Sequence, residues 1–413
     1  MNRYCNDIGT VEKITEGPLG PHMVAYTEHL CAEGYAKESA TRMLRIVAGF
    51  SRWLKRKRIA VARIIPQHVR HYLRSRKGSG YQPHRCDQAA LSRLLTLLAE
   101  RGAISPPCPK RLPTPSEELL QQYDAYLDKE RGLTWRTRID YAPFVKQFLT
   151  AQFGCGPASL AKLLPADIIR FVQRRALKLK PKYAQSLISA LRSFLRFARY
   201  RGQLTSDLAV HVPKVAGWSL SSVPKSIPPI QVEQVLSGCD RNTAMGRRDY
   251  AILLLLARLG LRGGEVAHLT LDDVDWENGC LTIHGKGGRI DQLPLVADVG
   301  KAIAVYVKNG RPRRSNDRHL FLRARAPITG FKDHQAVGSL VRHALARAGI
   351  DSPQKGAHQF RHALASAMLR RGRSLVEIGE ILRHRSPNTT ALYAKVDLVS
   401  LRALALPWPG GGQ

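Results

Sequence analysis

The sequence lacks the cysteine pattern of a disulfide-bonded or zinc-binding protein. Its 413 residues include only seven cysteines, and no two of them form a CxxC pair. Scattered cysteines in an odd number indicate reduced thiols. The sequence also has no long hydrophobic run, since the longest one, residues 251–257, is far shorter than the roughly 20 residues that cross a membrane. Because no apolar signal core follows the first residues, we expect a cytoplasmic protein.

Acidic residues are scarce relative to basic ones. Lys and Arg total 65 against 32 Asp and Glu, which gives a formal net charge of +33. Such an excess repels itself unless a polyanion neutralises it, and nucleic acid is the leading candidate, ahead of a membrane surface or a ribosome. The basic residues are spread along the chain, which favours a protein that wraps around its ligand. Apolar residues make up 44% of the chain, enough for the cores of two or three domains.

An internal repeat organises the first half of the chain. Residues 64–72 match residues 163–171, and residues 90–102 match residues 190–202. Apolar residues recur three or four apart in both copies, which is typical of amphipathic helices. We therefore predict two small all-helical domains and expect at least one of them to contact DNA.

Two proline-rich stretches, 105–115 and 212–229, separate these domains from each other and from the C-terminal part of the chain. Proline lacks a backbone donor and resists helix, so both stretches are expected to be linkers. In the C-terminal part, residues 281–295 show a β-hairpin pattern with a Gly-rich basic turn, between helical patterns. The predicted parts are an N-terminal helical domain (1–105), a second helical domain (116–212), a linker (213–229) and a mainly helical C-terminal domain with a small β-sheet (230–413).

Two cationic residues in the C-terminal domain stand in distinctive sequences. Arg262 follows Leu-Gly-Leu and precedes Gly-Gly-Glu, while Lys286 occupies the Gly-rich turn. Taken singly, Arg262 could simply close a helix, and Lys286 could be a solvated turn residue.

A second motif, His-Gln-Phe-Arg-His, contains His358 and Arg361 three residues apart, which places them on one helix face. His358 and His362 are also spaced like two zinc ligands on a helix. However, residue 359 is Gln where a zinc protease carries its Glu base, and no third ligand follows, so we predict no metal site.

A third motif places His384 nine residues before Tyr393. Each side chain alone could be a core residue with a satisfied polar tip. The apolar segment 396–406 that follows could pack on its own domain or dock on a neighbouring subunit.

Taken together and in order, these sequences resemble the tyrosine recombinase (phage integrase) family. The resemblance covers roughly residues 225–405, and the helical domains resemble the core-binding domains of such recombinases, the first matching either a further copy or an arm domain. The resemblance implies that the protein forms a C-shaped clamp around DNA. It also implies that the protein is a family member encoded by a mobile element. The motifs that carry it are Leu-Gly-Leu-Arg262-x-x-Glu, Gly-Lys286-Gly-x-Arg, His358-x-x-Arg361-His, and His384 with Tyr393.

The resemblance implies that Tyr393 attacks DNA and holds the 3′-phosphate as a covalent phosphotyrosine. Arg262 and Arg361 would neutralise charge on the phosphate oxygens, because a guanidinium offers paired donors and stays ionised. Because the covalent link conserves bond energy, neither a metal, a cofactor nor ATP is required.

The remaining groups are assigned supporting roles by the same resemblance. His358 and His384 donate hydrogen bonds to the phosphate, and His358 helps to accept the tyrosine proton. Lys286 is the expected general acid for the leaving 5′-hydroxyl. Glu265 is expected to be a buried partner that orients Arg262 or its neighbours.

The basic residues Arg289, Arg383 and Arg385 are further candidates for DNA contact. Arg383 stands where the family usually has Gly, and residues 263–264 are Gly-Gly where an apolar and a small polar residue are more typical. These departures affect the local backbone and remove no catalytic group.

The predicted function is site-specific recombination: integration, excision or transposition of a DNA element. A type IB topoisomerase would use nearly the same residues, and a DNA-binding regulator that has lost the chemistry is the alternative from another class. The expected partners are double-stranded DNA and further copies of the chain, as a homo-tetramer or a mixed recombinase assembly on two DNA sites, with accessory proteins as additional candidates. We expect no membrane partner and a nucleoid-associated location in the cytoplasm.

Overall fold

The protein is mainly helical with one small antiparallel sheet, as predicted. It divides into two compact units, one formed by residues 108–221 and the other by residues 1–107 together with 222–413. The computed structural model describes residues 16–78, 85–104, 113–154, 156–157, 159–214, 226–285, 288–313, 315–352 and 354–396.

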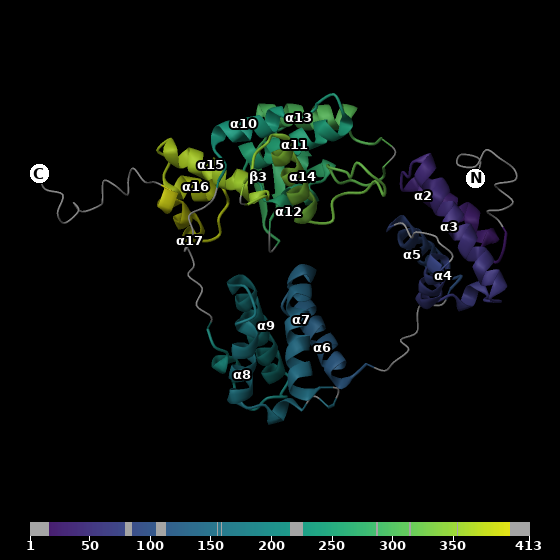
Figure 1. Cartoon of the computed structure of the whole chain (residues 1–413). Helices are drawn as coiled ribbons and strands as arrows, with labels where there is room; N and C mark the ends of the chain where they lie inside the picture. Colours follow the sequence, from purple (N-terminus) through teal and green to yellow (C-terminus); the bar gives the residue numbers. More distant parts are fainter. Residues whose placement is uncertain are drawn as a thin grey trace, which may run out of the picture. The chain divides into compact units, whose positions relative to one another are not determined.

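Residues 16–78 and 85–104 form a helical bundle around their own apolar core (Figure 1). Helix α3 (Lys37–Arg56) is amphipathic, since Leu44, Val47 and Phe50 recur three residues apart and are fully buried. The elements are η1 (Gly20–His22), α2 (Met23–Ala32), α3 (Lys37–Arg56), η2 (Val61–Arg63), α4 (Pro66–Gly78) and α5 (Arg85–Glu100).

The second helical unit repeats the central order of the first: two α-helices, a 3-10 helix and two further α-helices. One hydrogen bond recurs in both copies: Tyr26 Oη donates to the carbonyl of Ala90 (2.9 Å), and Tyr123 Oη donates to the carbonyl of Ala190 (3.4 Å). The matching sequences therefore form matching structures. The elements are α6 (Pro115–Lys129), α7 (Trp135–Phe153), η3 (Leu160–Lys162), α8 (Pro165–Ala176), α9 (Pro181–Tyr200) and η4 (Leu208–His211).

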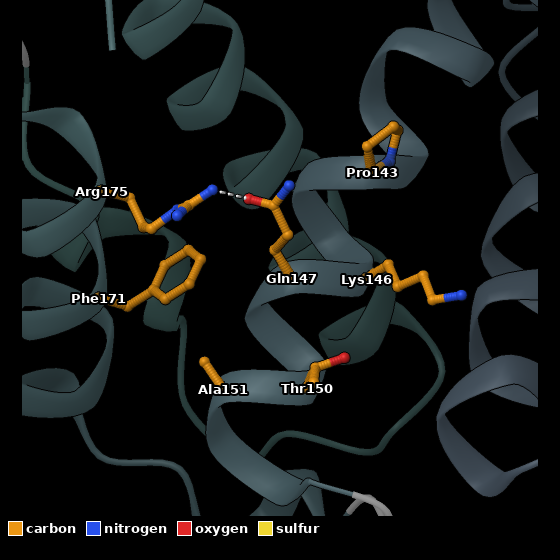
Figure 2. A pocket seen from close by; sticks show the side chains of 7 residues that line it. All are labelled: Pro143, Lys146, Gln147, Thr150, Ala151, Phe171 and Arg175. Atoms are coloured by element: carbon orange, nitrogen blue, oxygen red, sulfur yellow. Dashed lines mark hydrogen bonds between the residues drawn. The ribbon is translucent and has the colours of Figure 1, made fainter. Parts of the chain in front are cut away.

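An open pocket of about 460 Å³ lies between α7 and α8 of this unit (Figure 2). Phe171 and Pro143 line its apolar part, while Lys146 lies at its edge and the Arg175 guanidinium donates to the side-chain oxygen of Gln147. None of the predicted catalytic residues lines this pocket, since all of them belong to the C-terminal domain.

The C-terminal domain packs helices around the apolar helix α11, whose residues 251–257 are all buried. Thr243 caps that helix by accepting a hydrogen bond from the backbone of Gly246 (3.0 Å). The helices are α10 (Pro229–Ser237), α11 (Ala244–Arg258), α12 (Gly263–His268), η5 (Leu271–Asp273), α13 (Ala297–Asn309), α14 (His334–Arg347), α15 (His358–Arg370), α16 (Leu375–Ile381), α17 (Pro387–Thr390) and η6 (Ala391–Val396).

The sheet of this domain has the strand order β1 (Val274–Asp275), β2 (Cys280–His284) and β3 (Ile290–Pro294), all antiparallel. Cys280 pairs with Pro294 and His284 with Ile290, so β2 and β3 form the hairpin expected from the sequence. In the described part of the chain, no helix combines the length and apolar character needed to cross a membrane.

Candidate active site

Arg361, in the first turn of α15, is the centre of the candidate site. Its side chain is buried and donates from Nη1 to the carbonyl of Gly260 and from Nη2 to the carbonyl of Leu382. Gly260 lies two residues before Arg262, and Leu382 lies two residues before His384. Arg361 therefore links its own helix α15 to the segments that carry Arg262 and His384, the other predicted phosphate ligands.

The backbone conformation and close packing at position 260 explain why the Leu-Gly-Leu-Arg motif has glycine there. Gly260 has a φ of +58°, and a Cβ at this position would lie 2.8 Å from a methyl group of Leu382 and 3.0 Å from one of Leu364. A side chain here would be strained and would push α15 away. Gly260 thus permits the close approach that brings Arg361 to this loop.

Arg262 is held by Glu265 in the first turn of α12. The carboxylate of Glu265 accepts from the Arg262 backbone (2.8 Å) and from its Nη1 (2.7 Å), and it is 5% exposed. The side chain of Arg262 is 38% exposed, so part of its guanidinium stays accessible. The structure thus pairs the buried carboxylate of Glu265 with Arg262.

Burial, and after it the positive residues of the site, lower the pKa values of its histidines. Burial first, and then Arg361 and Arg262, lower the pKa of His358; the same causes lower that of His384 to about 4. Burial, with Arg262 next, lowers the pKa of Arg361 to about 10, which leaves it protonated at neutral pH. His384 Nδ1 lies 2.7 Å from Thr390 Oγ1.

Tyr393 is buried, and its hydroxyl contacts a histidine that sequence reasoning did not select. Tyr393 Oη lies 2.8 Å from Nδ1 of His362, and the side chain packs against Ile378 and Leu382. The His384 ring is parallel to the Tyr393 ring, with centroids 6.4 Å apart. The available signal was the place of His362 in the His-x-x-Arg-His motif, directly after Arg361 and four residues after His358.

Family models match two separate parts of the chain. Residues 225–398 match the phage integrase family, and residues 120–202 match its N-terminal SAM-like domain. A putative integrase/recombinase of Sinorhizobium fredii, y4rA, is 47% identical over the full length of both chains. The chain belongs to the tyrosine recombinase (phage integrase) family.

Two further comparisons give another relative and a solved structure of the same fold. Another putative integrase/recombinase of Sinorhizobium fredii, y4rF, is 32% identical over 99% of this recombinase and 96% of its own chain. Among solved structures, XerH site-specific recombinase bound to a palindromic difH substrate has a TM-score of 0.56 at 17% identity, covering 72% of this chain and 98% of its own. At this identity the XerH structure shows the shared fold.

The other predicted residues of this recombinase occupy different environments. Arg289 and Arg385 are exposed, whereas the side chain of Arg383 is 5% exposed and donates from Nη2 to Glu265 (2.7 Å). As placed here, Arg383 does not present its guanidinium to a DNA phosphate. Lys286 lies outside the described residues. Within the described ranges, no three His, Cys, Asp or Glu side chains are grouped to hold a metal ion.

Acid should destabilise the catalytic domain of this recombinase. Burial first lowers the pKa of His362 and of His384 to about 4, while an unfolded histidine titrates near 6.5. The unfolded state therefore binds more protons between about pH 6.5 and about pH 4, so stability is lost as the pH falls through this window. Urea unfolding and hydrogen exchange of α15 across that range would measure the loss.

Matched variants separate this effect from general acid denaturation. His362→Gln and His384→Gln should each reduce the pH dependence, whereas His343→Gln, at an exposed site on α14, should not. An unchanged pH dependence in both site variants would contradict the assignment.

Proposed function

We propose that this recombinase cleaves and rejoins double-stranded DNA at specific sites, with Tyr393 as the nucleophile. The observation that carries the proposal is the position of Arg361: it bonds to the segments of Arg262 and His384, on the same helix as the histidine in contact with Tyr393. The family relatives support recombination and give no support to the topoisomerase or regulator alternatives.

Arg262 and Arg361 are proposed to bind the scissile phosphate. Both cations lie near His358 and His384, whose neutral rings can each donate one hydrogen bond. Charge that develops on the non-bridging oxygens would then meet donors fixed in advance, which is an effective form of transition-state stabilisation. Tyr393 Oη would bond to phosphorus as the bond to the 5′-oxygen breaks, and Lys286 would protonate that oxygen.

The proton of Tyr393 is proposed to pass to His362 and not, as expected from the sequence, to His358. His362 Nδ1 is the nitrogen that the hydroxyl contacts, and because burial lowers the pKa of His362 to about 4, its ring is neutral at pH 7. Burial raises the pKa of Tyr393, with Arg361 acting in the opposite direction, so the phenol needs a base beside it. Tyr393 is 2% exposed and must turn outward to reach DNA.

Replacing His362 by Gln should slow covalent capture of DNA about 100-fold, because general-base assistance is worth at least this much. The side-chain amide keeps a hydrogen bond to Tyr393 without accepting its proton. The measurement is the single-turnover rate on nicked DNA, compared with His343→Gln. Faster capture by His362→Gln would show instead that the histidine only retains Tyr393 in its buried position.

DNA is the partner of this recombinase. We propose that the helical units 1–105 and 116–212 and the catalytic domain 230–413 together form a clamp that surrounds the DNA. Arg289 and Arg385 are exposed and are proposed to contact phosphates. XerH binds a palindromic substrate, and a palindrome offers equivalent half-sites to two copies of a protein. A tetramer on two sites, docking through residues 396–406 and associated with the nucleoid, remains a prediction, as do accessory or sister recombinases.

The proposed function is tested by trapping covalent complexes. The full chain is incubated with nicked duplexes of random sequence, and SDS-resistant complexes are isolated and their DNA is sequenced. We expect one enriched motif, and its arrangement of half-sites would show how many copies bind. Capture without any sequence preference would move the assignment to a topoisomerase, and tight binding without capture would favour a regulator.

A further inference from the structure

Arg383 occupies a backbone position that favours glycine. Its φ is +54°, in the left-handed region, where a side chain costs free energy that glycine does not. The side chain is nevertheless kept, almost fully buried between α12 and the sheet. A strained and buried cation beside His384 requires a compensating role.

The guanidinium of Arg383 reaches the same carboxylate that holds Arg262. Its Nη2 donates to Oε2 of Glu265 at 2.7 Å, and Oε2 also accepts from the Arg262 backbone at 2.8 Å. Oε1 of Glu265 binds the Arg262 side chain at 2.7 Å. One carboxylate is therefore shared by two arginines, and its charge is only partly available to Arg262.

The other side of Arg383 faces the hairpin. Its Nε lies 3.8 Å from Oδ2 of Asp291 on β3, while Oδ1 of Asp291 accepts from Nε of Arg289 at 2.7 Å. Among the described residues, neither Nε nor Nη1 of Arg383 has a hydrogen-bond acceptor. The contact with Asp291 is thus an ion pair that a small movement of β3 would turn into a hydrogen bond.

We propose that Arg383 is a positioning residue that links Glu265, and through it Arg262, to Asp291 on the β2–β3 hairpin. The inference rests on the proposed function, in which Arg262 binds the phosphate and the hairpin turn carries the general acid. By sharing the charge of Glu265, Arg383 leaves Arg262 free to attract phosphate. By pairing with Asp291, Arg383 fixes the position of the hairpin relative to the phosphate-binding side chain of Arg262.

The test uses full-length Arg383→Gly, because glycine suits the positive φ and keeps the fold. On nicked duplexes enriched by one round of wild-type trapping, Arg383→Gly should slow covalent capture at saturating DNA about 10–100-fold, the loss expected from a displaced reactive group. The midpoint of DNA binding should change less than about threefold, because the Arg383 side chain is buried and donates to Glu265. Arg383→Lys should recover part of the rate by keeping a cation beside Glu265.

A double-mutant cycle tests the link to the hairpin. Asp291→Asn should slow capture in the wild-type background but have little further effect in Arg383→Gly, since interacting residues give non-additive losses. Arg373→Gly, at a side chain that is 62% exposed in the same domain, is the matched control.

Two results would overturn the assignment: capture by Arg383→Gly at the wild-type rate, or losses for Arg383 and Asp291 that combine independently. Failure of the proposed function would appear elsewhere, in the comparison of wild type with Tyr393→Phe, where Arg383 is unchanged.

Discussion

Replacing Tyr393 by Phe should abolish the SDS-resistant complex with DNA, while the affinity for DNA changes less than about threefold. The phenol oxygen is the atom that would bond to phosphorus, so its removal leaves no nucleophile. Removal of a catalytic nucleophile costs on the order of 10⁶ in rate where it has been measured, which places the product below detection. The measurement is gel retention of labelled nicked duplex after SDS treatment, beside binding under native conditions.

The matched control is Tyr306→Phe. Tyr306 is also buried in the C-terminal domain, and its hydroxyl accepts from the backbone of Leu322 at 3.2 Å. Loss of this bond should lower the free energy of unfolding by about 1 kcal/mol and leave covalent capture intact. Capture that survives in Tyr393→Phe, or that disappears in Tyr306→Phe while the protein is folded, would contradict the assignment of the nucleophile.

Affinity for DNA should fall steeply with salt. The net charge of +33 is carried by all parts of the chain, and exposed cations lie on α4 (Arg70, Arg74) and on α8 and the turn after it (Arg174, Lys178). If about 6–10 phosphates are neutralised, released counterions should lower the affinity about 10³–10⁵-fold between about 50 and 200 mM salt. A salt titration of binding by fluorescence anisotropy measures the slope.

Pairs of charge-neutralising substitutions show which helical unit contributes to the salt dependence of DNA affinity. Each lost phosphate contact should reduce the slope by about one. Arg70→Gln with Arg74→Gln probes the first unit, and Arg174→Gln with Lys178→Gln probes its repeat. A flat salt response in the wild type would contradict the wrapping of DNA, and an unchanged slope in one variant would remove that helix from the interface.

Several parts of the fold could be predicted because they depend on local pattern. Apolar periodicity predicted the helices of both repeats, and the turn residues between 281 and 295 predicted the hairpin β2–β3. The linear order of the motifs around Arg262, Arg361 and Tyr393 was sufficient to place the chain in its family. These features require only the neighbouring residues along the chain.

The contacts of the site could not be read in the same way. His362 and Tyr393 are 31 residues apart, and Arg383 and Glu265 are 118 apart. No periodicity relates such positions, because their distance depends on how α12, α15 and the segment after α16 pack. His362, which has no assigned catalytic role in the sequence motif, thus contacts the nucleophile, and Arg383, which we expected to contact DNA, is a buried partner of Glu265.

The sequence by itself determined the family, the helical repeat and the set of residues suited to phosphate chemistry, since each depends on residue type and local spacing. Only the tertiary structure decided which of these groups touch. Gly260 leaves no side chain between its loop and α15, so Arg361 reaches both Gly260 and Leu382 and draws three distant segments together. Close packing, which local sequence does not encode, is what turns separate motifs into one site.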